Sequence, residues 1–393
     1  MRERPDPTLD AWADAPTGLT RRELLKAAAV GACALCVGGA LFSVPAARAQ
    51  SAQPGLIGRQ PSPWFEALGG GEVRCTLCPL RCRLADGQRG PCRVRENRAG
   101  RGYTLVYGNP SLVQLDPVER KPFFHVLPGT RALSVSTAGC PIECRFCEVW
   151  DMALVAPEEV YAYDLPPDAL VQHALEVGAA SLSFAFGEPV AFFEYMLDAA
   201  ALARAAGLRV LVHTSGYIEE APLLALASVV DAVNVDLKGF DEAFYRDLCS
   251  AELGPVLRTL EVLHQAGVHL EITNLVIPTL NDDDAQIRAM CEWIVGALGR
   301  DVPLHFSRFY PLYKLANLPP TPVSTLDRAR AIALDAGVRY VYVARVTGHE
   351  GEDTFCPHCG EVAIARMGFM VEHVAIDEGR CRGCGGRIEG RWA

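Results

Sequence analysis

The sequence lacks a surplus of positive charge, and it shows neither an internal repeat nor a low-complexity tract. Its net charge is −10 over 393 residues, which argues against a protein coated with basic charge for nucleic acid. One local exception runs from Arg81 to Arg101, where seven arginines stand against only Asp86 and Glu96. We favour a solvated loop over an anion-binding face for this stretch. With 50% hydrophobic and 21% charged residues, the chain has the composition of a soluble protein with two or three domains.

A fourth cysteine is missing beside three that stand close together. Residues 136–150 read STAGCPIECRFCEVW, which places Cys140, Cys144 and Cys147 at the spacing C-x3-C-x2-C. A disulfide needs cysteines in pairs, and a structural zinc ion needs four ligands. Three thiolates instead suit a metal centre with one open position, above all a four-iron cluster. The alternatives are a zinc ion with a distant fourth ligand, or three cysteines of the core.

Two further cysteine groups have four members each. They consist of Cys356, Cys359, Cys381 and Cys384 near the C-terminus and of Cys75, Cys78, Cys82 and Cys92 near the N-terminus. The C-terminal group forms two C-x2-C pairs, which predict a closed zinc-ribbon site, with rubredoxin-like iron as the minority alternative. The spacing of the N-terminal group suits either zinc or an auxiliary iron–sulfur cluster. All these ligands must be thiolates, so we expect the metals to be loaded where thiols stay reduced.

The first fifty residues have the pattern of a twin-arginine export signal. Arg21 and Arg22 precede a weakly apolar run from Ala27 to Val44, and the triplet at 47–49 fits a small-x-small cleavage site. That route carries folded proteins, so a metal centre could be built in the cytoplasm first. We expect cleavage after residue 49 and export to the periplasm. The alternatives are a cytoplasmic protein and a membrane-tethered one, since 18 apolar residues are at the short limit of a span.

Alternating strand and helix patterns fill the middle of the chain. Seven short β-rich runs are separated by helical stretches such as PDALVQHALEVG. The runs lie at 132–138, 181–186, 209–214, 232–237, 269–277, 303–309 and 339–345. This alternation predicts a parallel sheet, either open or closed into a barrel. In such barrels the working groups lie at the carboxyl ends of the strands.

The three-cysteine loop follows the first of these strands, and it resembles the cluster loop of the radical S-adenosylmethionine enzymes. In that family three thiolates hold three irons of a four-iron four-sulfur cluster, and the fourth iron binds S-adenosylmethionine. One electron cleaves the sulfonium, and the resulting 5′-deoxyadenosyl radical takes a hydrogen atom from a substrate. The resemblance implies an α/β fold, namely an incomplete (β/α) barrel flanked by two small cysteine-rich metal modules.

The same resemblance implies cofactor contacts at other strand ends. Gly187 and Glu188, after the second strand, are similar to the family's short acidic motif near the amino group of the cofactor. Asp236 and Lys238 resemble the Asp-Leu-Lys of glycyl-radical activating enzymes, whose lysine lies near the cofactor carboxylate; the alternative is an exposed lysine at a strand end. His305 on the sixth strand is a further candidate, with a core histidine as the alternative. No catalytic residue is assigned.

A series of motifs in fixed order extends the resemblance over about residues 73–392. The series looks like the radical enzyme of the AmmeMemoRadiSam system, which is associated by name with Memo-type and AMMECR-type partner proteins. The motifs are CTLCPLRC at 75–82, GPCRVREN at 90–97, DPVERKPFFHVLPG at 116–129, the cluster loop, DLKGF, ITNLVIPTLND, PLHFSRFYP and the terminal CPHCG, CRGCG and IEGRW. The chain departs from that family at 186–187, where Tyr-Asn is usual, and at 344–345, where Gly-Asn is usual.

These features divide the chain into five parts. The parts are a signal peptide at 1–49, a linker at 50–72, an N-terminal cysteine-rich module at 73–130, a radical SAM barrel at 131–350 and a zinc-ribbon-like tail at 351–393. We expect an enzyme that cleaves S-adenosylmethionine at its cluster and abstracts hydrogen from an unidentified, macromolecular substrate. A separate electron donor would supply the electron for this cleavage. The alternatives are a glycyl-radical activating enzyme, a nucleic-acid-modifying radical enzyme and a non-catalytic metal-binding scaffold.

Overall fold

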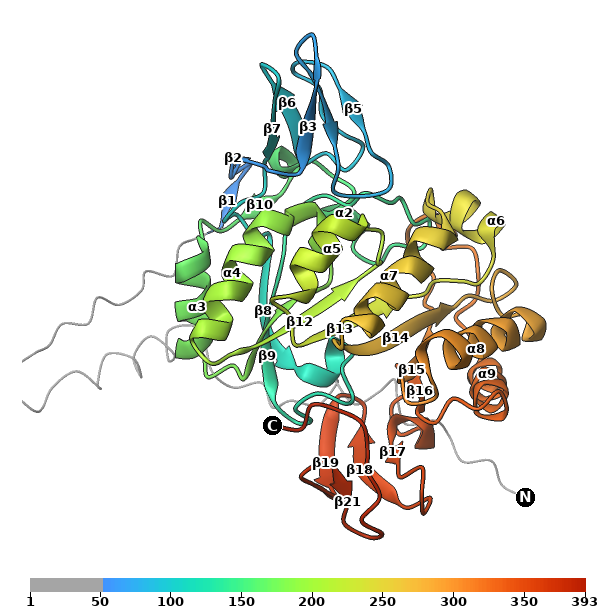
Figure 1. Cartoon of the computed structure of the whole chain (residues 1–393). Helices are drawn as coiled ribbons and strands as arrows, with labels where there is room; N and C mark the ends of the chain where they lie inside the picture. Colours follow the sequence, from blue (N-terminus) through green and yellow to red (C-terminus); the bar gives the residue numbers. More distant parts are fainter. Residues whose placement is uncertain (1–51) are drawn as a thin grey trace, which may run out of the picture. The chain divides into compact units, whose positions relative to one another are not determined.

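The computed structural model describes residues 52–393, so the predicted signal peptide at 1–49 lies outside the described residues. The main feature of the described part is an eight-stranded sheet in the order β16-β15-β14-β13-β12-β11-β9-β8 (Figure 1). Its strands are β8 (Leu112–Pro117), β9 (Arg131–Ser136), β11 (Ser181–Phe184), β12 (Arg209–Thr214), β13 (Ala232–Asp236), β14 (His269–Val276), β15 (Leu304–Arg308) and β16 (Val341–Ala344). Neighbouring strands from β9 to β16 pair in parallel. The predicted fold class, an incomplete (β/α) barrel, is confirmed.

The seven predicted strands all occur, and their ends agree with the prediction to within two residues. The eighth strand, β8, was not predicted, and it pairs antiparallel with β9 from Leu112 opposite Ser136 to Pro117 opposite Arg131. The sheet therefore begins inside the segment that we assigned to the N-terminal module, which ended at residue 130.

Helices connect the parallel strands and pack against the sheet. The longer ones are α3 (Pro167–Glu176), α4 (Phe193–Ala205), α5 (Glu220–Ala227), α7 (Leu253–Gln265), α8 (Asp284–Leu298) and α9 (Val323–Asp335). Shorter segments are η1 (Val118–Arg120), α2 (Trp150–Ala153), η2 (Pro157–Glu159), η3 (Pro189–Phe192), α6 (Glu242–Phe244), the π-helical η4 (Tyr245–Cys249), η5 (Tyr313–Leu315) and η6 (Glu350–Glu352). None of the helices in residues 52–393 is long and apolar enough to cross a membrane.

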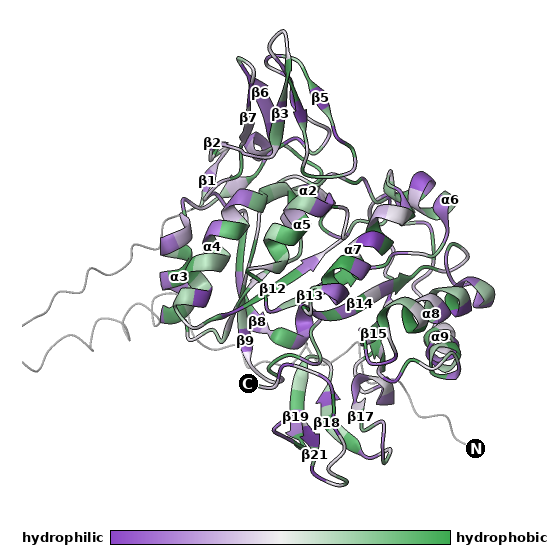
Figure 2. Cartoon of the chain, in the orientation of Figure 1, coloured by the Kyte–Doolittle hydropathy of each residue, from purple (hydrophilic) through white to green (hydrophobic). Residues whose placement is uncertain are grey.

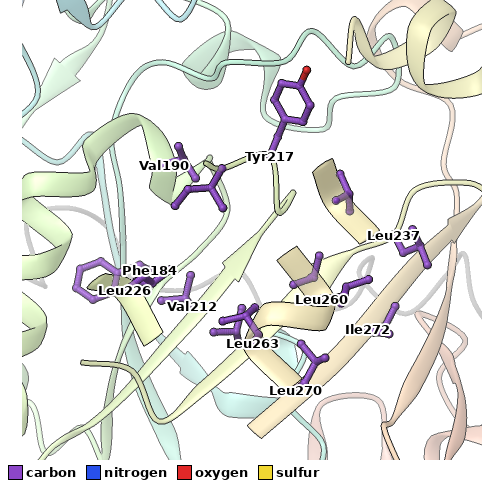
Figure 3. Packing of buried hydrophobic residues seen from close by; sticks show 14 of the residues in the cluster. Phe184, Val190, Val212, Tyr217, Leu226, Leu237, Leu260, Leu263, Leu270 and Ile272 are labelled. Atoms are coloured by element: carbon purple, nitrogen blue, oxygen red, sulfur yellow. The ribbon is translucent and has the colours of Figure 1, made fainter. Parts of the chain in front are cut away.

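Apolar side chains fill the space between these helices and the sheet. In α7 the residues Val256, Leu260 and Leu263 recur at helical spacing and are fully buried, which is the stripe expected of a helix packed on one side. Figure 2 shows hydrophilic residues on the same helix, and Figure 3 shows Leu260 and Leu263 beside Leu270 and Ile272 of β14. Burying each such side chain stabilises the fold by about 1.5–3 kcal/mol. The core therefore holds the strands in the register that sets the site.

The N-terminal segment is folded, so the linker predicted at 50–72 is wrong for the part that the structure describes. Strand β1 (Gln53–Pro54) pairs with β10 (Tyr161–Ala162), and two three-stranded sheets follow. They contain β2 (Gln60–Pro61), β7 (Arg101–Thr104) and β6 (Arg95–Arg98), and β3 (Phe65–Gly69), β4 (Glu72–Cys75) and β5 (Arg83–Leu84). The linker was predicted because residues 50–71 are rich in Pro, Gly and Ser. Pro54 and Pro61 lie in two-residue strands, and the run of three glycines at 69–71 makes the turn between β3 and β4 with positive φ.

The C-terminal tail forms a second small β unit. Strands β17 (Thr354–Phe355), β18 (Val362–Met367) and β19 (Met370–Val374) make one sheet, and β20 (Ile376–Asp377) pairs with β21 (Arg380–Cys381). The tail is attached to the sheet through His125, whose ring nitrogens contact the hydroxyl of Tyr342 at 2.6 Å and the carbonyl oxygen of Glu389 at 2.5 Å. The backbone N–H of Arg391 donates to the carbonyl of His125 at 2.7 Å.

Candidate active site at the carboxyl ends of the strands

A cavity of about 550 Å³ lies at the carboxyl ends of the parallel strands, the place where the barrel prediction put the working groups. It is lined by the three loop cysteines and by residues at the ends of β11, β12 and β13. These residues are Cys140, Cys144, Cys147, Gly187, Glu188, His213, Thr214, Ser215, Asp236 and Lys238. The structure thus brings the cysteine loop together with four of the five predicted cofactor contacts.

The cysteine loop is held close to the end of β9 by a glycine. Gly139 has φ of +97°, and a Cβ there would lie 2.5 Å from the side chain of Val94, so a larger residue would not fit. The other side of the loop is fixed by η4. The N–H of Glu143 donates to the carbonyl of Cys249 at 2.9 Å, and that of Arg145 donates to Leu248 at 2.8 Å.

The three loop thiols have different electrostatic surroundings. Burial, with the nearby carboxylate of Glu188, raises the pKa of Cys140 well above its ordinary value, and burial raises the pKa of Cys147 to about 11. A hydrogen bond with Cys249 lowers the pKa of Cys144, and the charge of Lys238 acts in the same direction. Around neutral pH, thiols with a raised pKa stay protonated unless a positive centre, such as a metal, stabilises the thiolate. This donor set therefore fits a metal cluster with three protein ligands.

Glu188 is held in place by three donors, of which two lie at the end of β12 and one lies in η3. Its Oε1 accepts from the hydroxyl of Thr214 at 2.6 Å and from the N–H of Val190 at 3.1 Å, and its Oε2 accepts from the N–H of Ser215 at 2.9 Å. A carboxylate has about four acceptor sites, so Oε2 keeps one for a further donor. The adjacent Gly187 is required by space, because a Cβ there would lie 2.3 Å from Oγ of Ser136.

Asp236 and Lys238 form an ion pair at the end of β13. Nζ of Lys238 lies 2.8 Å from Oδ2 of Asp236, and Nε2 of His213 lies 2.8 Å from Oδ1. Although burial opposes both charges, Lys238 lowers the pKa of Asp236, and Asp236 with Cys144 raises the pKa of Lys238. Both groups therefore stay charged around neutral pH. His213 was not predicted from the sequence, because nothing in its local pattern shows this partner.

His305 does not line the cavity, so the prediction that it contacts the cofactor is corrected. Its side chain is fully buried, with Nε2 placed 2.6 Å from Oε2 of Glu271. The rings of Phe124 and Tyr342 pack against it at centroid distances of 4.8 and 4.9 Å. Ser307, one pleat further along β15, does line the cavity. The prediction therefore chose the correct face of β15, but His305 lies further from the carboxyl end of the strand than the residues that line the cavity.

Lys121 and Phe186 form a second group in the cavity lining, and sequence reasoning gave neither a role. Nζ of Lys121 lies 2.6 Å from Oδ2 of Asp116 and 4.0 Å from the ring centre of Phe186. Burial lowers the pKa of Lys121 to about 8. Phe186 has φ of +73°, which is uncommon for a bulky residue. Lys121 lies in the motif DPVERKPFF, which contributed to the resemblance only as one of a series of motifs in fixed order. This motif was the one sequence feature that could have indicated a role for Lys121.

The arginine-rich stretch from Arg81 to Arg101 is mostly neutralised. Six of its seven arginines lie within 4.0 Å of a glutamate oxygen, such as Arg93 with Glu143 at 2.6 Å. These partners include residues far along the chain, so the arginines tie the N-terminal strands to the barrel. This pairing argues against an anion-binding face, but the predicted solvated loop is also wrong, because the stretch contains β5, β6 and the start of β7 and buries Arg95.

The four tail cysteines come together as a single-ion site would require. Their ligand atoms all lie within 4.8 Å of one another, with Sγ distances of 3.7 Å between Cys356 and Cys384 and 3.8 Å between Cys359 and Cys381. The structure therefore brings the predicted tail ligands into one group. The four N-terminal cysteines lie in the strands and turns from β4 to β6, and three of them are buried.

Comparison with known proteins gives the class of this chain. The model of the Radical SAM superfamily matches residues 134–291, and the chain belongs to that superfamily. It is 39% identical over 328 residues to an uncharacterized protein of Methanocaldococcus jannaschii, covering 83% of this chain and 98% of the relative.

Activating enzymes are among the more distant relatives. The chain is 25% identical to the benzylsuccinate synthase activating enzyme of Thauera aromatica, over 58% of this chain and 71% of that one. It is 22% identical to the pyruvate formate-lyase 1-activating enzyme of Escherichia coli K12, over 55% and 93%. Among solved structures, a domain of the pyruvate-formate lyase-activating enzyme from Bacteroides vulgatus has a TM-score of 0.38 at 16% identity, covering 42% of this chain and 99% of that domain.

Proposed function

We propose that this chain is a radical SAM enzyme that binds a four-iron four-sulfur cluster at Cys140, Cys144 and Cys147 and abstracts hydrogen from a macromolecular substrate. One observation carries the proposal: these three thiols line the same cavity as Glu188 and Lys238. A cluster with an open iron and a polar clamp for an amino acid moiety are the two parts that reductive cleavage of S-adenosylmethionine needs.

The residues of the chain position the cofactor and do no redox chemistry themselves. When bound, the cluster and S-adenosylmethionine supply the electron and the radical chemistry. Glu188 offers the remaining acceptor site on Oε2 to an ammonium group, and Lys238 offers a positive charge to a carboxylate. Asp236 and His213 orient Lys238, while Thr214 and Ser215 orient Glu188. Because these side chains are held before the cofactor binds, little further ordering is required.

A protein or peptide substrate is supported by the side chains around the cavity. Leu312 and Phe369 line it and are 41% and 39% exposed. Trp150, 42% exposed, stacks on Tyr313 with ring centres 5.2 Å apart. Exposed aromatic and aliphatic groups gathered in this way are typical of surfaces that bind another macromolecule.

The activating-enzyme relatives favour a narrower version of this proposal. They are named for the activation of benzylsuccinate synthase and of pyruvate formate-lyase, and the Asp236–Lys238 pair is similar to their Asp-Leu-Lys. On this version the chain would install a radical on a partner protein. The resemblance to the AmmeMemoRadiSam radical enzyme makes Memo-type and AMMECR-type proteins the first partners to test. A separate electron donor would be needed in each case.

The other two functions have less support. A nucleic-acid-modifying enzyme was suggested by the arginines between 81 and 101, and most of these are paired with glutamates. A non-catalytic scaffold would not explain why three thiols and the Asp236–Lys238 ion pair line the same cavity.

Two further parts complete the proposal. We propose that the tail cysteines hold one zinc ion, because their close, closed arrangement suits a single tetrahedral ion. We also propose that residues 1–49 direct export by the twin-arginine route, which would carry the protein with its metals already bound.

The proposed cofactor clamp can be tested by electron paramagnetic resonance of the reduced, reconstituted protein. Adding S-adenosylmethionine should change the cluster spectrum, because the cofactor becomes a ligand of the open iron. Glu188→Gln should weaken this binding about tenfold, since the variant loses a charge-assisted hydrogen bond. Glu176→Gln, at an exposed site on α3, is the matched control. A spectrum that does not respond to saturating cofactor would refute the proposal.

A further inference from the structure

The N-terminal thiol group has no part in the chemistry proposed at the cavity, yet it is built as a site. It consists of Cys75, Cys78, Cys82 and Cys92. Sγ of Cys92 and Sγ of Cys82 lie 3.7 and 3.8 Å from the position that a Cβ would take at Gly90. The N–H of Cys75 donates to the carbonyl of Cys82 at 2.9 Å. Cys82 and Cys92 therefore approach the same point, and the backbone of Cys75 at the end of β4 is tied to that of Cys82.

The spacing of these thiols differs from that of the tail site. Within residues 52–393, the tail cysteines alone form a group of three or more ligand atoms that all lie within 4.8 Å of one another. Four thiolates about 2.3 Å from one zinc ion must come that close. An iron–sulfur cluster is larger, so its thiolates stand further apart. Cys140, Cys144 and Cys147 do not form such a close group either, and they are the cysteines proposed above to hold an iron–sulfur cluster.

A buried arginine supplies a second observation beside the same thiols. Arg95 is 3% exposed, and its Nη atoms bind both carboxylate oxygens of Glu194, at 3.0 and 2.8 Å. Its Nε has no hydrogen-bond partner although it is buried. Burial alone would lower the pKa of Arg95, but the negative charge of Glu194 raises it, and Cys75 and Cys92 would act in the same direction as thiolates. An unpaired buried N–H costs stability, and a sulfur acceptor at the thiol site would satisfy it.

The thiol group also lies against the cluster loop. A Cβ at Gly139, next to Cys140, would lie 2.8 Å from the carbonyl oxygen of Cys92. Nη2 of Arg93 lies 2.6 Å from Oε1 of Glu143 in the same loop. The backbone that carries one thiol group therefore packs directly on the backbone that carries the other.

We propose that Cys75, Cys78, Cys82 and Cys92 hold a second iron–sulfur cluster, and that Nε of Arg95 donates a hydrogen bond to one of its sulfur atoms. Hydrogen bonds to sulfur raise the reduction potential of such clusters, so Arg95 is a positioning and tuning residue. This site does not depend on the proposed function, because it uses none of the residues that line the cavity.

Metal and sulfide analysis of the full chain tests the site. The chain is reconstituted anaerobically with iron and sulfide, both as wild type and as a variant in which Cys140, Cys144 and Cys147 are serines. The variant should keep iron, acid-labile sulfide and a cluster signal in electron paramagnetic resonance after reduction. The loss of all iron from it, with a second zinc ion per chain, would overturn the proposal.

The wild type decides the matter if the loop variant does not fold. The wild type should contain more iron per chain than the about four atoms of a single four-iron cluster. The excess iron should disappear when Cys75, Cys78, Cys82 and Cys92 are replaced by serine. About four irons in both proteins would overturn the proposal. Cofactor cleavage at the loop is assayed separately, so failure here can be told from failure of the proposed function.

The role of Arg95 has its own readout in the potential of the second cluster. In the loop variant, Arg95→Lys keeps the positive charge but removes the Nε donor, so the midpoint potential should become more negative. Arg83→Lys changes an exposed arginine of the same strands that is paired with Glu72 and should leave the potential unchanged. Equal potentials in the two variants would show that Arg95 does not bind the cluster.

Discussion

Nζ of Lys238 lies 2.8 Å from Oδ2 of Asp236, in a cavity that also contains three cysteine thiols. The pair keeps a buried lysine charged, because Asp236 raises the pKa of Lys238 although burial opposes it. A charged lysine at this place can attract the carboxylate of S-adenosylmethionine. If Lys238 binds the cofactor as proposed, the pair should therefore prevent proton loss from Lys238 and keep cofactor binding independent of the titration of this lysine around neutral pH.

Removing the carboxylate should make cofactor binding depend on pH. In Asp236→Asn, Lys238 loses its counter-ion while it remains only 12% exposed, and a buried lysine without a partner has a lowered pKa. As pH rises, the variant loses the positive charge and its affinity for S-adenosylmethionine falls, whereas the wild type keeps the charge. The measurement is the ratio of the two affinities from pH 6 to pH 9, which removes the titration of the cofactor itself. A ratio that does not change with pH would contradict this role; Asp335→Asn, in a surface pair, is the control.

The cluster should depend on each loop thiol without the fold depending on it. We expect Cys140→Ala to abolish cluster assembly and cofactor cleavage while the circular dichroism of the barrel stays unchanged. Cys291→Ala removes a buried thiol of α8 and should leave the cluster intact. Visible absorbance of the cluster after reconstitution is the measurement. Normal absorbance and turnover in Cys140→Ala would show that the loop is not the cluster site.

The tail should lose its structure with its metal. Cys356→Ser removes a buried ligand of a closed four-thiolate site, so the full-length variant should contain about one zinc ion per chain fewer than the wild type. Amide hydrogen exchange in residues 354–393 should become fast, while α7 stays protected. An unchanged zinc content, or slow exchange in a tail without metal, would be evidence against a structural zinc site.

The attachment of the tail should weaken in mild acid. His125 is buried, and burial lowers its pKa to about 3, against about 6.5 in an unfolded chain. The unfolded state therefore binds the proton first, so stability is lost as pH falls from about 6.5 towards 3. At pH 5.5 this one group costs about 1.4 kcal/mol relative to neutral pH.

Melting temperatures at pH 7.5 and 5.5 test this prediction. In His125→Gln the fall between the two pH values should be smaller than in the wild type, because the titrating group is gone. His264→Gln, at an exposed position near the end of α7, should keep the wild-type fall. If His125→Gln and the wild type respond equally, the acid sensitivity has another origin.

The predicted signal can be tested in cells. With wild-type protein, we expect a mature species that begins near residue 50 outside the inner membrane. Arg21→Lys with Arg22→Lys should abolish it, whereas Arg2→Lys with Arg4→Lys should not. Fractionation followed by N-terminal sequencing is the measurement. Full-length protein found only in the cytosol in every case would show that the signal is not used.

Local patterns predicted much of the fold and part of the site. The seven parallel strands, the cysteine loop, Glu188 and Lys238 are all readable from short stretches, because strand ends in a parallel sheet converge on one edge. Cys249 and His213 were missed, since their contacts with Cys144 and Asp236 depend on the tertiary fold. His305 was misplaced because strand periodicity gives the face of a residue but not its depth. The glycines at 69–71 suggested a linker, because composition does not separate a flexible segment from a tight turn.

The release of 5′-deoxyadenosine tests the central claim most directly. Reconstituted protein is incubated without oxygen with S-adenosylmethionine and a strong one-electron reductant, and the products are separated by liquid chromatography and identified by mass. The wild type should form 5′-deoxyadenosine and methionine in equal amounts, and Cys144→Ala should form neither. A wild-type protein that carries its full complement of iron and sulfide, yet yields no more 5′-deoxyadenosine than Cys144→Ala, would contradict the proposed function.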